Sequence, residues 1–311
     1  MILLEYHNAV VEKTLAPIVS LKETVLDSTV VDFDGVVYHI STRTSKDVIW
    51  FSLSWSCYNE LTKWGATDML RKEYGQYLIS SPEQGYNLTL EFDLKNLPST
   101  EEEREALVKK MALIKRNLLA QPFEHAFDQQ AQFEDNDQPN PQPDLMQIHY
   151  RDQEAIYIQA QHDRVTVIFS TLFKEETDRI VGKVFLQEFV DARRLPNIQN
   201  APQVLYSHKE PPLEIRHLPE FRHLKESENV GFVTFVLFPR HFVRGDVRDA
   251  TISQIQLFRD YLHYHIKCSK AYMHSRMRAR VQAFLKVLNR AKPDPVVVEK
   301  KTISGRNVIK S

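Results

Sequence analysis

The sequence predicts an α+β protein built from two similar α/β modules, each of antiparallel strands plus helix, with a long C-terminal α-helix. Each half of the chain holds several short segments rich in β-branched and aromatic residues, followed by a helical segment. The last helical segment, residues 249–292, contains neither Pro nor Gly. Glycine occurs only eight times in 311 residues, and few helices separate successive strands. Both facts argue against a doubly wound parallel sheet with glycine-rich ligand loops.

The amino-acid composition is typical of an ordinary soluble protein. With 42% hydrophobic and 26% charged residues and a net charge of −1, the chain is long enough for two domains and is not basic as a general nucleic-acid binder would be. Cys57 and Cys268 are too few for a disulfide framework and lie in no metal-type spacing, which fits a reducing cytosol. The N-terminus lacks the features of a signal peptide. The longest apolar run, residues 230–239, is too short to span a bilayer, so no integral membrane segment is expected.

Residues 1–133 are predicted to form the first module. An amphipathic stretch at the start is followed by strand and helix patterns, which lie at residues 8–15, 30–41 (strand), 48–56 (strand), 58–74 (helix) and 86–94 (strand). A further helix opens after residues 98–100, and the three glutamates of its first turn suit the helix dipole. We expect this helix to end near Ala120, because Pro122 should perturb it.

Residues 134–144 are predicted to be the linker, since they hold three prolines and four acids. Residues 145–248 form the predicted second module. Short polar turns separate four predicted strands of an antiparallel meander, at residues 148–150, 155–160, 165–173 and 180–189. Residues 195–229 carry five prolines and predict an irregular surface excursion, and residues 230–238 are the last strand. The long helix at 249–292 and a tail at 293–311 complete the chain.

The long helix is predicted from apolar residues at steps of three, four and seven, which share one helix face. They are Ile255, Leu262, Ile266, Met273, Met277, Val281, Phe284 and Leu288. Asp249 is the expected N-cap, and Pro293 stops the helix. At 1.5 Å per residue such a helix reaches roughly 60 Å, about twice the usual length in a domain of this size.

The same helix carries a one-sided charge. No Asp or Glu occurs from Tyr261 to Lys292. The basic residues there are Lys267, Lys270, Arg276, Arg278, Arg280, Lys286, Arg290 and Lys292. The helix dipole favours cations only near the last turn, so an acidic partner explains the run better. A solvated basic rim, or a basic amphipathic ligand for a membrane surface or calmodulin, remains the alternative.

An enzymatic alternative rests on Asp32 and Asp34. The stretch from Val30 to Val36 resembles the nucleophile motif of haloacid-dehalogenase-like phosphotransferases, in which the first Asp attacks phosphorus and the second acts as acid and base. That chemistry needs a parallel sheet, which the pattern does not predict, so a strand–turn–strand is the preferred interpretation. An EF-hand fails as well, because the twelfth position is Arg43 and not Glu.

No other motif predicts catalysis or ligand binding. His263 and His265 are two residues apart, which on a helix separates them by about 200° and prevents a shared metal. The chain has no phosphate-binding Gly-Lys-Ser/Thr loop and no Gly-x-Ser-x-Gly elbow. We therefore expect no catalytic residue, no metal and no cofactor.

Long strings of residues carry a family resemblance that runs nearly end to end. The matching strings include 32–35, 148–152 and 284–291, and the most specific are 201–205, 210–214, 234–241 and 258–272. In these strings the chain resembles the p34-class family, subunit two of the actin-related protein 2/3 complex, which nucleates branched actin filaments. The resemblance implies two modules of one fold, with a long helix that packs against the matching helix of a smaller homologous core subunit.

The resemblance also implies partners and a location. The two actin-related subunits would sit on this core pair and would hold the ATP, and the pair would grip the side of the pre-existing filament in the cytoplasmic actin cytoskeleton. On this basis the protein is expected not to be an enzyme. The apolar line of the helix is the expected subunit interface, and the basic residues, together with Arg193 and Arg194, are expected to face actin.

Overall fold

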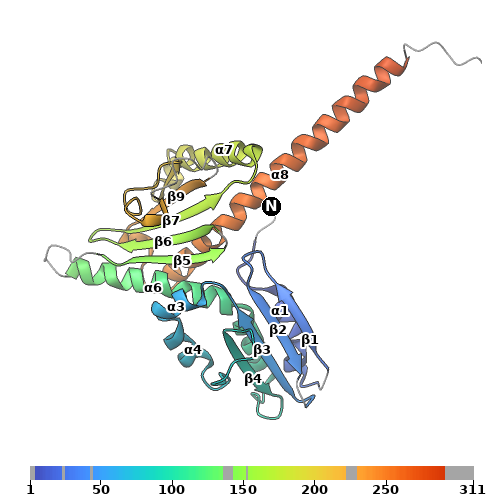
Figure 1. Cartoon of the computed structure of the whole chain (residues 1–311), viewed down its shortest axis with the longest axis vertical. Coiled ribbons are helices and arrows are strands. Elements are labelled where there is room, and N and C mark those ends of the chain that lie inside the picture. The colour runs from blue at the N-terminus through green and yellow to red at the C-terminus, as the bar shows by residue number, and fades with distance from the viewer. Residues whose placement is uncertain are drawn as a thin grey trace, which may run out of the picture. The chain divides into compact units, whose positions relative to one another are not determined.

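The computed structural model describes residues 4–22, 25–42, 45–135, 143–151, 153–221 and 230–290. The chain divides into two compact units, Met1–His265 and Ile266–Ser311. The first unit holds two antiparallel sheets with their helices, and helix α8 (Asp246–Arg290) begins in this unit and ends in the second (Figure 1). The α+β class predicted from the sequence is confirmed.

The first sheet is a four-stranded antiparallel meander. Its strands, in spatial order, are β1 (Asp27–Val31), β2 (Val37–Thr42), β3 (Val48–Ser54) and β4 (Leu88–Asp93). Between β1 and β2 the Asp32 Oδ1 atom accepts hydrogen bonds from the backbone N–H groups of Asp34 and Val36, both at 2.9 Å. Gly35 supplies the positive φ of 74° that closes the turn. The predicted strand–turn–strand is confirmed.

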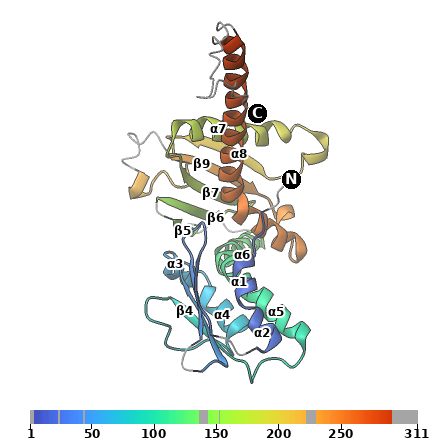
Figure 2. The ribbon, with the colours of Figure 1, turned by 90° about the vertical axis from the view of Figure 1, so that its right-hand side faces the viewer.

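Among the described residues, six helices precede the second sheet along the chain. They are α1 (Ala9–Thr14), α2 (Ala16–Ser20), α3 (Tyr58–Lys63), α4 (Ala66–Tyr74), α5 (Glu101–Ala112) and α6 (Ile114–Asp135). The last of them, α6, packs against β6 (Glu154–Ala160) of that second sheet. Helices α1 and α2 pack against α5 (Figure 2). The single helix expected over residues 58–74 is divided at Gly65, whose φ of 100° a helix cannot include. Thr100 caps α5 through its side chain, as the sequence pattern predicted.

The expectation that a helix ends near Ala120 is wrong. Helix α6 contains Pro122 and continues for thirteen residues, to Asp135. A proline inside a helix costs about 3 kcal/mol, but each fully buried large apolar side chain contributes roughly 1.5–3 kcal/mol. Phe123 and Phe127 follow Pro122 and are both fully buried, so packing outweighs the local cost. Of the predicted linker, residues 136–142 lie outside the described residues.

The second sheet has five antiparallel strands. In spatial order they are β5 (Leu145–Arg151), β6 (Glu154–Ala160), β7 (Val165–Leu172), β9 (Val230–Leu237) and β8 (Gln203–His208). The meander β5–β6–β7 and the last strand are confirmed. Each sheet thus contains a three-stranded meander, a connection with helices, and a further strand beside the third, and each is followed by a long helix (Figure 1). This repeated order supports two modules of similar design.

The strand predicted at residues 180–189 is wrong, because these residues lie in helix α7 (Glu176–Ala192). Its buried residues Asp178, Gly182 and Leu186 are four apart, which is the spacing of a helix face and not of a strand. The β-branched and aromatic residues of this stretch favour a strand by propensity, but tertiary packing decides the outcome.

Residues 195–229 are less irregular than expected. They contain the edge strand β8 and the short 3-10 turns Pro196–Ile198 and Pro219–Phe221. Ile215 and Leu218 are buried against Tyr157, Ile168 and Phe232, so this segment covers one face of the second sheet. Residues 222–229 lie outside the described residues.

Helix α8 begins at Asp246, so Asp249 lies in its first turn and is not the N-cap that the sequence predicted. The Phe258 ring packs against Phe235, with ring centroids 4.8 Å apart, and against Phe169 at 5.4 Å. These contacts place the first part of α8 on the second sheet. Lys292, Pro293 and the tail lie outside the described residues. Among the residues that the structure places, none of the helices is long and apolar enough to cross a membrane.

Candidate interaction surface

The apolar line of α8 changes environment along its length. Ile255, Leu262 and Ile266, which the sequence assigned to a subunit interface, are buried, with exposed fractions of 6%, 0% and 0%. The five later members of the line are exposed: Met273 by 43%, Met277 by 61%, Val281 by 55%, Phe284 by 63% and Leu288 by 50%. We call these five residues the distal stripe. Every residue from 271 to 290 is exposed.

The distal stripe is a coherent surface and not a scatter of apolar residues. At 100° per residue, its five side chains fall within about 40° of Met277 around the helix. Helices in proteins are stabilised mainly by packing of an apolar face and not by propensity alone. A narrow stripe of half-exposed apolar side chains is typical of a surface that packs against a partner, which makes the distal stripe a candidate interaction surface.

Basic residues border the stripe on both sides. By the same helical geometry Arg276 and Arg280 lie on one flank and Arg278 on the other. The Arg276 guanidinium donates a hydrogen bond to the Tyr272 hydroxyl at 2.8 Å, and it lies over that ring at 5.6 Å from the centroid. This contact holds one of the three arginines in a defined direction.

The other predicted basic residues are placed differently. Lys286 projects from the side of the helix opposite the stripe, whereas Lys270 lies close to the line of the stripe. Lys267 and Arg290 are exposed near the two ends of the basic run. Arg193 is the C-cap residue of α7, and the exposed Arg194 pairs with Asp191 at 3.3 Å.

The first part of α8 is held by ion pairs as well as by apolar packing. Arg248 donates hydrogen bonds to Glu124 at 2.8 Å and to Asp128 at 2.9 Å, both on α6. Arg259 pairs with the buried Glu154 of β6 at 3.0 Å. These bonds fix the start of α8 to elements of both sheets' modules. The exposed part of the helix has no acidic residue with which to form such bonds.

The carboxylates of Asp32 and Asp34 are held by a lysine. The Lys115 Nζ atom lies 2.7 Å from Asp32 Oδ2 and 2.5 Å from Asp34 Oδ2. Burial alone would lower the pKa of Lys115, but Asp34 and Asp32 together raise that pKa above its ordinary value, so the ammonium stays charged. With Asp32 Oδ1 used by the turn, these acids form a structural ion cluster. The haloacid-dehalogenase-like phosphatase alternative is therefore not supported.

Of the histidines in α8, His263 and His265 have separate surroundings, as predicted. His263 stacks on Phe173 and lies 3.9 Å from Glu154, whereas His265 stacks on Phe185 with centroids 4.9 Å apart. Within the described ranges no group of three or more His, Cys, Asp or Glu side chains could hold a metal ion.

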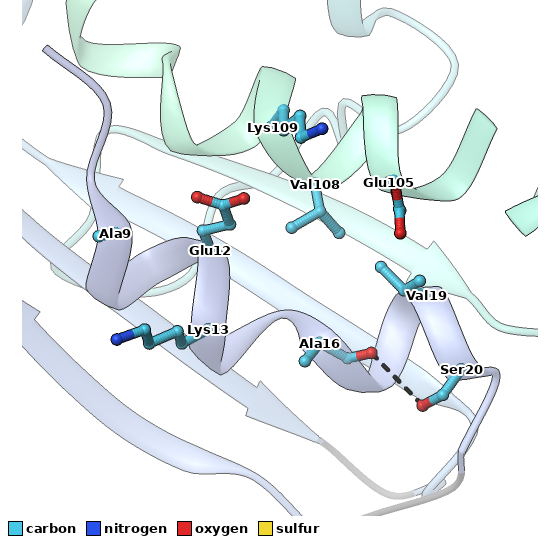
Figure 3. Close-up of a pocket in the computed structure, with 9 residues that line it drawn as sticks. All are labelled: Ala9, Glu12, Lys13, Ala16, Val19, Ser20, Glu105, Val108 and Lys109. Atoms are coloured by element: carbon cyan, nitrogen blue, oxygen red, sulfur yellow. Dashed lines mark hydrogen bonds between the residues drawn. The ribbon is translucent and has the colours of Figure 1, made fainter. Parts of the chain in front are cut away.

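The described residues also form concave sites that the sequence did not predict, two of which follow. One is an open groove between α1–α2 and α5, where Val19 and Val108 face each other and Glu12, Lys13, Glu105 and Lys109 stand at the rims (Figure 3). Its charges are mixed in sign and its polar groups do not converge, so the groove indicates no particular ligand. The other lies between α7 and β8 and could not be found in advance, because α7 was predicted to be a strand.

Comparison with known proteins identifies relatives over the whole length. Residues 51–295 match the family model described as Arp2/3 complex, 34 kD subunit p34-Arc. The chain is 50% identical over 323 residues to the actin-related protein 2/3 complex subunit 2 of Schizosaccharomyces pombe, covering 100% of both chains. It is 40% identical to the protein of the same description from Dictyostelium discoideum, covering 98% of each.

Proposed function

This chain belongs to the family of Arp2/3 complex 34 kD subunits, p34-Arc, and we propose that it is a structural core subunit of that complex. In this role it pairs with a smaller homologous core subunit, supports the two actin-related subunits, and binds the side of the mother actin filament during branched nucleation. It acts in the cytoplasm, at the cortical actin cytoskeleton, and is not an enzyme.

The distal stripe is the observation that carries the pairing. Five apolar side chains in one line, each about half exposed, need an apolar partner of similar length, and a second long helix is the simplest one. Covering what remains exposed of the five would contribute on the order of 5 kcal/mol. The proposed interface is therefore limited to the distal stripe, since Ile255, Leu262 and Ile266 are already buried.

The filament contact rests on charge. Arg276, Arg278 and Arg280 flank the stripe, so a partner helix on the stripe would leave guanidinium groups along the edges of the pair. A basic edge attracts and orients an acidic surface such as that of actin, which speeds encounter more than it raises final affinity. We propose that these three arginines make the main contact with the filament, and that the other basic residues that the sequence assigned to actin, on α8 and at Arg193 and Arg194, contribute less.

The proposal can be tested by capture. The chain is tagged, recovered from native cytosol at moderate salt, and the mass and composition of the eluted material are determined. Recovery in a stoichiometric seven-subunit assembly with two actin-like proteins supports the proposed role. Elution of the chain alone as a stable monomer would overturn it.

A further inference from the structure

A small basic pocket lies between helix α7 and strand β8 of the second module, away from the distal stripe in sequence. Its lining residues are Arg179, Ile180 and Lys183 of α7, Tyr206 and His208 of β8, and the adjacent Lys209. The pocket encloses about 360 Å³, which is near the lower end of the range for small-ligand sites. No carboxylate is among the described residues that line it.

Two features of the fold create this pocket: the alternation of side chains along strand β8 and a glycine on the neighbouring strand. Tyr206 and His208 are two apart on β8, so both side chains project to the same face of the sheet. His208 pairs in register with Gly231 of β9. A Cβ atom on Gly231 would lie 3.0 Å from the Tyr206 ring and 3.1 Å from its hydroxyl, so glycine leaves the space that Tyr206 occupies.

Polar groups in the pocket are incompletely paired. The Tyr206 hydroxyl is shielded from solvent and makes no hydrogen bond with the described residues. Both ring nitrogens of His208 are shielded as well, and the Val230 backbone lies close enough to act as a weak acceptor for that ring. Such incompletely paired groups cost stability in the free protein and are expected where a ligand completes them. Burial lowers the pKa of His208, as do the charges of Arg179 and Lys209, although the nearby Val230 backbone acts in the opposite direction. His208 is therefore neutral at neutral pH and retains one N–H donor.

The charged residues add an attraction for anions. Arg179 and Lys183 are four apart on α7 and so lie on one face of the helix. Arg179 donates one hydrogen bond to Glu176 at 3.1 Å, which uses a single edge of its guanidinium. A guanidinium, an ammonium, a phenol hydroxyl and an imidazole N–H together make a donor set suited to a phosphate dianion.

The surroundings of the pocket indicate what kind of molecule would carry a phosphate group into it. Strand β8 is at the edge of the five-stranded sheet and pairs only with β9 among the placed strands. Ile180, which lines the pocket, is exposed by 54%, and Leu205, on the other face of β8, is exposed by 47%. An open strand edge with apolar neighbours favours an extended polypeptide over a free anion. We propose that the pocket binds the phosphate of a phosphorylated side chain in an extended segment of a partner protein, which pairs with the edge of β8.

The test uses the assembled complex and a short fluorescein-labelled peptide of alternating valine and threonine with one central phosphoserine. Its unphosphorylated twin, inorganic phosphate as competitor, and phosphatidylcholine vesicles with a phosphorylated inositol lipid are measured in parallel. We expect anisotropy to report binding of the phosphopeptide and not of the twin. Arg179→Gln and Lys183→Gln should each weaken this binding about tenfold, since each removes a charge-assisted contact. Lys63→Gln, which removes an exposed lysine of α3, should leave it unchanged.

A Tyr206→Phe variant separates a binding role from a structural one. It removes only the unpaired hydroxyl, so the thermal midpoint of the free protein should stay equal or rise, while phosphopeptide affinity falls about threefold to tenfold. Unchanged affinity in this variant would overturn the assigned role of Tyr206. Equal binding of phosphopeptide and twin, competition by inorganic phosphate at the peptide's own affinity, or variant-sensitive binding to the vesicles alone would each overturn the proposal. None of these outcomes bears on the assembly role.

Discussion

The two parts of helix α8 have the same apolar periodicity and opposite environments. Up to Ile266 the apolar line is buried, and the ion pairs of Arg248 and Arg259 hold this part to α6 and β6. From residue 271 to residue 290 every side chain is exposed, and no acid is present. The apolar periodicity of a helix therefore predicts that one face is buried, but not whether the same chain or a partner covers it. The balance of acidic and basic residues along the helix helps to distinguish these two cases.

Removing an ion pair from the first part of α8 should have the largest effect on the stability of the chain. Glu154 is 5% exposed and Arg259 is 11% exposed, so Glu154→Gln removes the nearer counter-charge of a buried guanidinium and leaves only the longer pair with Asp260, at 3.4 Å. We expect a loss of about 3–5 kcal/mol in the free energy of unfolding, measured by urea denaturation of the full chain. The matched change in the exposed part, Arg276→Gln, should alter that free energy by less than about 0.5 kcal/mol. Similar losses in the two variants would contradict the division of the helix.

Two leucines of the same apolar line offer a sharper test. Leu262 is 0% exposed and Leu288 is 50% exposed. Leu262→Ala should destabilise the chain by about 2–5 kcal/mol, because it leaves a cavity in the core. Leu288→Ala should change the stability of the chain by less than about 0.5 kcal/mol in the same urea titration. A large loss for Leu288→Ala would mean that the chain itself already buries this residue.

The distal stripe can also be tested through the assembly. Met277→Asp places a charge where the partner is proposed to pack, and burial of an unpaired carboxylate is strongly unfavourable. We expect the variant chain to fold but to recover little of the smaller core subunit on capture from cytosol, as measured by the stoichiometry of the eluate. Met277→Leu keeps the apolar contact and should recover the full assembly. Full recovery with Met277→Asp would show that the stripe is not the interface.

Most elements could be predicted from the sequence, because they depend on local patterns, and the same patterns led to the proposed interaction surface. The failures have physical causes beyond the local pattern. Pro122 is accommodated because Phe123 and Phe127 are buried behind it. Residues 180–189 form a helix although their β-branched and aromatic side chains favour a strand. The buried and exposed parts of the apolar line of α8 could not be distinguished, because only three-dimensional packing places the second sheet on the first part.

Charge reversal of the basic residues that flank the distal stripe should affect the stability of the chain least. It should selectively weaken filament binding. In the variant Arg276→Glu, Arg278→Glu and Arg280→Glu combined, three exposed cations become anions without change to the apolar stripe. We expect the composition of the captured assembly to be unchanged, while co-sedimentation with actin filaments weakens at least tenfold at low salt. The difference from the unmodified assembly should shrink as ionic strength rises, since exposed charges are screened within about 8 Å at physiological salt.

The matched control for this charge reversal is Lys286→Glu, whose side chain projects from the opposite side of the helix. If this single reversal weakens filament binding as strongly as the triple change, the filament is contacted by a face of α8 other than the flanks of the distal stripe. If the triple change lowers recovery of the assembly and filament binding by the same factor, the arginines serve subunit pairing. If the triple change weakens filament binding and leaves the assembly intact, the two functions separate on one helix. Only this outcome supports the distal stripe as the contact with the partner subunit and its basic flanks as the contact with actin.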